Sequence, residues 1–234
     1  MSNIENIVKG SFRLLNVVPP TVGAFDPVAI FNRLADERHA FDPVKAKSGF
    51  ERAKLSDGFV SVNYRFVSAD AMVILRNGKF ERFEYSTVET CSMAFNRTFA
   101  VIQGNADAIK MGRFELAKAA GVGFAEIHLA PVRVYKLSES MSMIRAIALK
   151  KMKRGNVSGA TFSGKFESMS EIEPFASSEN TKSIKGTVET CDGLRTIAIN
   201  SDAKVSIGLT REEKADGIDA RVLQWIFNFV TNGR

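Results

Sequence analysis

The chain has few of the residues that most often carry catalysis or bind metals. Its 234 residues include two histidines, two cysteines and one tryptophan. His39 follows a charged run and is typical of a solvated residue, whereas His128 stands in an apolar segment and is typical of a core or edge residue. No histidine pair has metal-site spacing, and no nucleophile–histidine–acid motif is present. We therefore expect a protein that is not an enzyme, with no catalytic residues, metal or cofactor.

Long apolar runs are also missing. The apolar stretch around 144–149 is interrupted by Arg145, and no stretch approaches the ~20 residues that span a membrane. The N-terminal residues lack the basic start and apolar run of a signal peptide. Cys91 and Cys191 are expected to be reduced, mostly buried and not bridged, because two cysteines in a chain of this size indicate a reducing compartment. These absences predict a cytoplasmic protein with no membrane partner.

What the chain does contain is an excess of positive charge on an ordinary globular composition. Hydrophobic residues make up 45% and charged residues 25% of the sequence. Lys and Arg number 32 against 26 Asp and Glu, which gives a formal net charge of +6. Such an excess favours a polyanionic partner, since phosphate contacts come mainly from Lys and Arg. Many basic proteins bind no nucleic acid, so charge alone does not decide.

One pentapeptide, Thr-Val-Glu-Thr-Cys, occurs twice, at Thr87–Cys91 and at Thr187–Cys191. A small residue precedes each copy, Ser86 in the first and Gly186 in the second. An Arg-Thr pair and a short apolar run follow each copy. This similarity indicates a duplicated half-domain, in which the two copies are equivalent strands of superposable halves.

Glu89 and Glu189 recur with the pentapeptide and are the symmetric acidic candidates for a site. Paired carboxylates can serve acid–base or metal chemistry. The simpler interpretation is a solvent-facing strand residue that was copied with the rest. The glycine-rich segments lack the spacing of a phosphate-binding loop, so nucleotide-dependent chemistry is not indicated.

Residue patterns divide the chain into predicted elements. Strands are expected at 11–18, 59–67, 71–75, 80–91, 98–102, 157–166, 183–191, 194–200 and 204–209. An Asn-Gly pair at 77–78 predicts a two-residue hairpin turn. Helices are expected after the Asp-Pro pairs at 26–27 and 42–43 (to about 38 and 55), from Asn105 to 120, and after Thr210 to the C-terminus.

Two segments are harder to interpret. Residues 124–137 are apolar or alternate between apolar and polar, as in a strand, but Pro131 interrupts them and suggests an edge or a bend. Residues 138–152 are ambiguous, although an apolar stripe with helical spacing favours a helix there; the stripe consists of Met141, Ile144, Ala148 and Met152.

Together these elements predict an α+β fold with two pseudo-symmetric halves, each an antiparallel meander flanked by helices. Residues 1–56 form an N-terminal strand and short helices, 57–137 the first half-repeat, and 138–234 the second. One way to join the halves is edge to edge, as a continuous curved sheet with its helices on one face. Saddle-shaped nucleic-acid binders share that architecture, which by itself does not establish function.

Two groups of basic residues are candidate phosphate contacts. The first is centred on the end of the predicted helix, with Lys150, Lys151, Lys153 and Arg154 there, Arg145 upstream and Lys165 downstream. The second interleaves with aromatic residues on the predicted strands and contains Arg65, Arg76, Lys79 and Arg82. Simpler interpretations are a solvated helix end for the first group and, for the second, aromatic residues that turn inward to form core. With Met152 on the helical stripe, we expect four of the first group to project to solvent beside one another and to form the main positive surface: Lys150, Lys151, Lys153 and Arg154.

The leading interpretation is a non-enzymatic protein that binds nucleic acid, DNA or RNA, through its phosphate backbone with little sequence specificity. The alternative is a protein–protein interaction or scaffolding protein that acts as a homo-oligomer through its sheet edges or last helix. A steep fall of affinity with salt distinguishes the first from the second.

Overall fold

The computed structural model describes residues 3–4, 7, 10–19, 25–150, 158–172 and 176–232. The described strands are β1 (Asn3–Ile4), β2 (Ser11–Val18), β3 (Gly49–Ser56), β4 (Phe59–Arg76), β5 (Lys79–Phe95), β6 (Phe99–Gly104), β7 (Gly123–Glu126), β8 (Met143–Lys150), β9 (Gly159–Phe166), β10 (Thr181–Thr190), β11 (Gly193–Asn200), β12 (Lys204–Ile207) and β13 (Ile218–Asp219). The described helices are α1 (Pro27–Leu34), α2 (Ala106–Ala120), α3 (Pro131–Leu137), α4 (Arg211–Asp216) and α5 (Ala220–Asn232), with short 3-10 turns at Glu37–His39, Ser138–Ser140 and Met169–Ile172.

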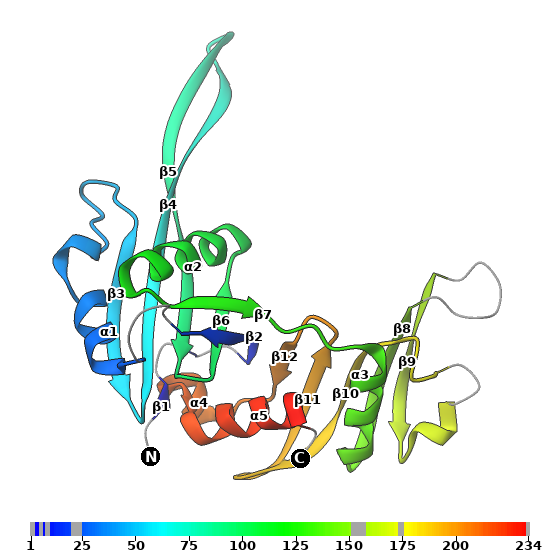
Figure 1. Ribbon diagram of the computed structural model, residues 1–234. Coiled ribbons are helices and arrows are strands. Elements are labelled where there is room, and N and C mark those ends of the chain that lie inside the picture. The colour runs from blue at the N-terminus through cyan, green and yellow to red at the C-terminus, as the bar shows by residue number, and fades with distance from the viewer. Residues whose placement is uncertain are drawn as a thin grey trace.

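One large antiparallel sheet organises the molecule (Figure 1). Its strand order is β3-β4-β5-β6-β2-β12-β11-β10-β8-β9, and β7 pairs with β2 beside this path. The strand β2 lies at the centre, where it joins β6 to β12. The predicted α+β fold with an antiparallel sheet and flanking helices is confirmed. The division at 56/57 and 137/138 stays a prediction.

The helices cover opposite faces of the sheet in its two parts. Successive side chains of a strand point to opposite faces, and along β2 the pair Leu15 and Val17 joins one core while Phe12 and Leu14 join the other. The first core lies under α1 and α2. The second lies under α3 and α5. The helices therefore occupy both faces, and not the single face considered from the sequence.

Local signals in the sequence located several elements well. The Asn105 side chain accepts a hydrogen bond from the Asp107 N–H at the start of α2, and Gly121 ends this helix with a left-handed φ of 70°. Asn77 and Gly78, with φ of 50° and 75°, form the hairpin turn between β4 and β5. The strand β2 has the predicted bounds.

Two predicted helices are wrong. Residues 143–150 form the strand β8, in which Ile147 and Leu149 are buried and Ala148 between them faces the other way. Residues 42–55 form a turn and then β3: the Asp42 side chain accepts hydrogen bonds from the N–H groups of Val44 and Lys45, as an N-cap does, but the chain turns back at Lys47. In both segments, pairing with neighbouring strands outweighs the weak helical pattern.

Two further predictions also need correction. Pro131 begins α3 at its first residue, where the missing N–H costs nothing, and does not lie at a strand bend. The C-terminal helix is divided into α4 and α5 at Gly217, although Thr210 caps α4 as predicted. No helix in the described part of the chain is long and apolar enough to cross a membrane.

Both copies of the pentapeptide lie in strands, but in different settings. The first pairs along its whole length with β4, the strand before it. The second pairs mainly with β11, the strand after it, and Cys191 already lies in the turn. Cys91 is followed by four more strand residues, up to Phe95. The two copies therefore stand at different positions relative to the turn that follows, and the duplication receives no support from the pairing.

Candidate nucleic-acid interface

The strands β12, β11, β10, β8 and β9 have one face that no helix of the described residues covers; we call it the open face, and Arg13 at the start of β2 borders it. It lies opposite the core under α3 and α5. The register places Lys204 beside Arg13, and Lys185 beside Ala198 on one side and Ala146 on the other. Most residues between the cations are small or polar, including Ser11, Ala146, Ala148, Thr161, Ser163, Ser183, Thr187, Thr196, Ala198 and Ser206. Apart from the cations, this face therefore consists largely of short side chains.

The open face is predominantly cationic. Its basic residues are Arg13, Arg145, Lys150, Lys165, Lys185 and Lys204, against Glu189 as the strand acid on the same face. Within the described residues the four lysines form no ion pair, and Arg145 donates from Nε to the Thr187 hydroxyl at 3.3 Å. Cations that are exposed and not neutralised by carboxylates are available for phosphate groups.

A hollow of about 940 Å³ lies at one end of the open face, between the sheet and α2. Arg13 and Lys204 line it from the sheet, and Lys110 and Arg113 line it from α2. The glycine at 104 lets two backbone segments approach, because a Cβ there would lie 2.5 Å from the Thr90 carbonyl oxygen. The hollow and the open face share Arg13 and Lys204, so they form one continuous basic surface.

Two carboxylates moderate the charge of the hollow. Glu126 accepts from Arg113 at 3.1 Å and from Arg13 at 3.4 Å through the same Oε1 atom. Glu89 accepts from the Asn105 amide at 3.0 Å, and its other oxygen is buried with no partner among the described residues. Glu189 is exposed on β10, so the structure does not bring Glu89 and Glu189 together. No group of three or more potential metal ligands occurs in the described part of the chain.

The cations selected from the sequence fall into separate places. Arg145, Lys150 and Lys165 lie on the open face, whereas Lys151, Lys153 and Arg154 lie outside the described residues. Arg65 is half-buried, and its guanidinium donates to the Glu51 carboxylate at 2.6 Å and to the Thr90 hydroxyl. The remaining three, Arg76, Lys79 and Arg82, are exposed on the outer part of the β4–β5 hairpin. The part of the predicted helix that the structure describes, residues 143–150, is the strand β8 instead.

The outer part of the β4–β5 hairpin, residues 69–86, projects from the body of the molecule (Figure 1); we call it the arm. Its aromatic residues are exposed, with Phe80 at 79% and Phe83 at 42%. The interpretation that the aromatics beside the second basic group form core holds for Tyr64 and Phe66. It is wrong for Phe80, Phe83 and Tyr85, because both strands extend past their neighbours β3 and β6.

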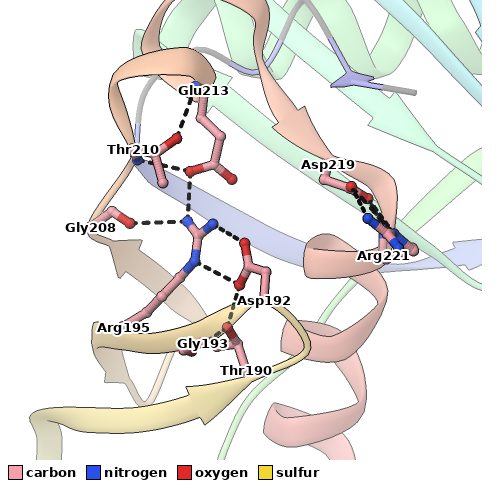
Figure 2. A network of polar contacts seen from close by, with 9 residues as sticks. All are labelled: Thr190, Asp192, Gly193, Arg195, Gly208, Thr210, Glu213, Asp219 and Arg221. Atoms are coloured by element: carbon pink, nitrogen blue, oxygen red, sulfur yellow. Dashed lines mark hydrogen bonds and ion pairs between the residues drawn. The ribbon is translucent and has the colours of Figure 1, made fainter. Parts of the chain in front are cut away.

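Arg195 forms a buried polar network that the sequence did not indicate (Figure 2). Its guanidinium donates to Asp192, to Glu213 at 2.6 Å and to the Gly208 carbonyl oxygen at 3.2 Å. Burial alone raises the pKa of Asp192, but hydrogen bonds from Arg195 and Thr190 outweigh it and hold that pKa below its usual value. The network joins the β10–β11 turn to the capped start of α4, and it is a structural tie rather than a reactive site.

The cysteines and histidines take no part in a common site. Both thiols are free, as predicted. Cys91 is buried, and burial raises its pKa to about 12. Cys191 is exposed, so the expectation that both thiols are buried is wrong for Cys191. His39 ends a 3-10 turn. His128 is exposed, 3.9 Å from both Glu126 and Asp202, and is therefore no core residue.

Five cations of the basic surface were missed from the sequence: Arg13, Lys110, Arg113, Lys185 and Lys204. Each stands alone in the sequence, so no charge run marks it. A usable signal is the alternation in segments such as Ser11-Phe12-Arg13 and Lys204-Val205-Ser206, where apolar residues enter the core and polar ones face out. Sheet order, which joins these strands, cannot be read from the alternation. Comparison with protein-family models and with curated proteins finds no match for this sequence.

Proposed function

We propose that the protein is a non-enzymatic nucleic-acid-binding protein that contacts the phosphate backbone through the open face. The observation that carries this proposal is the set of cations that the sheet order gathers on one face: Arg13 on β2, Lys204 on β12, Lys185 on β10, Arg145 and Lys150 on β8, and Lys165 on β9. Backbone contacts by Lys and Arg supply most of the affinity in sequence-independent binding.

The chemistry of the face favours low sequence specificity. No aromatic side chain of the described strands lies on this face, since Phe162 and Phe166 of β9 pack against the core under α3 and α5. Base stacking on aromatic platforms is therefore not provided there. Contacts to phosphates fix the position of a nucleic acid but carry no direct sequence information. The hollow, with Lys110 and Arg113, extends the same basic surface beyond the sheet.

The test compares two double variants that remove equal charge. Lys185→Gln/Lys204→Gln neutralises two cations on the open face, and Lys136→Gln/Lys214→Gln neutralises two exposed lysines on the helices α3 and α4. Affinity is measured by fluorescence anisotropy with single- and double-stranded DNA and RNA of several sequences. We expect the first variant to bind every sequence more weakly by a similar factor, and the second to bind like the unmodified protein. Equal affinity of the two variants would contradict the proposal.

A second candidate function, self-association as a scaffolding protein, is favoured by one observation. The arm exposes large apolar side chains on a projecting hairpin, with Leu75 at 65% and Phe80 at 79% exposure. Exposed apolar patches of this kind are typical of protein–protein contacts.

A further inference from the structure

The arm has two free strand edges. The partner strand β3 reaches β4 only as far as Arg65, and β6 reaches β5 only as far as Cys91. Between Ala69 and Ser86 the two strands pair with each other and with no other described strand. A two-stranded hairpin without further cover is marginally stable in water, and a free edge is a template for another strand.

The two edges differ in their protection. Along β5 the arm alternates charged and aromatic residues, and charges at an edge discourage pairing. Along β4 the segment Ala71–Leu75 reads Ala-Met-Val-Ile-Leu, with no charge, proline or glycine. Such a segment combines high β-propensity with low charge, which is the pattern of a pairing strand. The β4 edge is therefore the one open to a partner.

The backbone of Val73 points outward along this edge. The hairpin turn closes on the pair Arg76–Lys79, and pairs alternate along an antiparallel ladder between hydrogen-bonded and non-hydrogen-bonded types. Val73 pairs with Arg82, three pairs along from the turn, and so belongs to the non-hydrogen-bonded type. Its N–H and C=O groups consequently face away from β5.

Charge and area indicate what covers the arm. Its ionised side chains balance, with Asp70, Glu81 and Glu84 against Arg76, Lys79 and Arg82, so the arm does not select a polyanion as the open face does. Its seven exposed apolar side chains, from Met72 to Tyr85, together expose on the order of 700 Å², and the four on β4, from Met72 to Leu75, carry about half of this area. A neutral, apolar surface of this size complements a copy of itself.

We propose that the arm is a dimerisation element, in which β4 of one copy pairs antiparallel with β4 of a second copy about a twofold axis at Val73. Ala71 of each copy then lies opposite Leu75 of the other. The same segment serves both partners, as twofold symmetry requires. This inference rests on the second candidate function and is independent of nucleic-acid binding by the open face.

The test uses two proline variants that remove an outward N–H from opposite edges of the arm. Val73→Pro removes it from the β4 edge, and Arg82→Pro, at the paired position, removes it from the β5 edge. In sedimentation velocity without nucleic acid, we expect a dimer for the unmodified protein and for Arg82→Pro, and a monomer for Val73→Pro. Circular dichroism and the nucleic-acid titration check that both variants keep the fold and the open face.

Disulfide cross-linking supplies a second readout. Val73→Cys in a Cys191→Ser background should form a covalent dimer on mild oxidation, whereas Val88→Cys in the same background, exposed on β5 near the body, should not. A monomer at all concentrations, equal effects of the two prolines, or a monomer that binds neutral phospholipid vesicles through the arm would each overturn the proposal. An unmodified protein that is monomeric and binds nucleic acid would contradict the dimerisation proposal alone. A dimer that binds no nucleic acid would contradict the proposed function alone.

Discussion

Arg195 connects three separate segments of the chain through one side chain that is 7% exposed. It bonds to Asp192 in the β10–β11 turn, to Gly208 after β12 and to Glu213 in α4 (Figure 2). Glu213 also completes the capping box with Thr210. Removing the guanidinium leaves two carboxylates without their partner, one of them buried, and an unpaired buried charge is more costly than the intact pair is stabilising.

We therefore expect Arg195→Ala to lower the free energy of unfolding by about 3 kcal/mol, the lower end of the range for a broken buried pair, because Asp192 keeps contact with water at 34% exposure. Urea denaturation measures the change. Arg221→Ala is the matched control: Arg221 also binds a carboxylate, that of Asp219, but is exposed, so little change is expected. Similar losses in the two variants would show that the Arg195 network is no structural tie.

The two thiols should differ sharply in reactivity. Burial raises the pKa of Cys91 to about 12, so its thiolate is scarce at neutral pH, whereas Cys191 is exposed in a turn. We expect iodoacetamide to modify Cys191 in the native protein and to modify Cys91 only after unfolding. Peptide mass spectrometry measures both. Rapid native labelling of Cys91 would contradict its buried position on β5.

At the scale of the element, signals contained in a few neighbouring residues were sufficient for some predictions and not for others. Caps and turns depend on local chemistry, and Asn105, Gly121 and the Asn77–Gly78 pair were all located correctly. The sequence predicts a helix at β8 because the apolar spacing there fits the helical period of 3.6 residues as well as the strand period of two. Pairing of this segment with β9 and β10 makes it a strand. Long-range pairing of this kind leaves no local mark in the sequence.

The pentapeptide copies give a direct test of element equivalence. Ser86 precedes the first copy and is exposed, but a Cβ at Gly186 would lie 2.4 Å from the Met141 sulfur and 2.6 Å from the Met143 carbonyl oxygen. We expect Gly186→Ser to destabilise the protein by ~1–3 kcal/mol through overpacking. Gly208→Ser, where the nearest atom lies 3.8 Å away, is the control and should change stability by less than ~0.5 kcal/mol. Thermal denaturation that shows Gly186→Ser to be as harmless as the control would restore the idea of equivalent copies.

At the scale of the whole molecule, the strand β2 determines where function can reside. It unites two cores that lie on opposite faces, and this leaves the second part of the sheet uncovered on the face that carries Arg13 and Lys204. The antiparallel α+β class followed from the pattern of strands and helices. The open face did not, because its cations come from strands far apart in the sequence and are brought to one face only by the sheet order.

The salt dependence of nucleic-acid binding tests the central claim most directly. Each phosphate contact contributes a slope of about −0.7 to −0.9 to a plot of log affinity against log salt concentration. With four to six of the open-face cations engaged, we expect a linear plot with a slope of about −3 to −5 that is similar for unrelated sequences. Lys185→Gln/Lys204→Gln should make the slope shallower by about 1 for each cation removed. A slope near zero, or a slope that this variant leaves unchanged, would contradict phosphate binding by the open face.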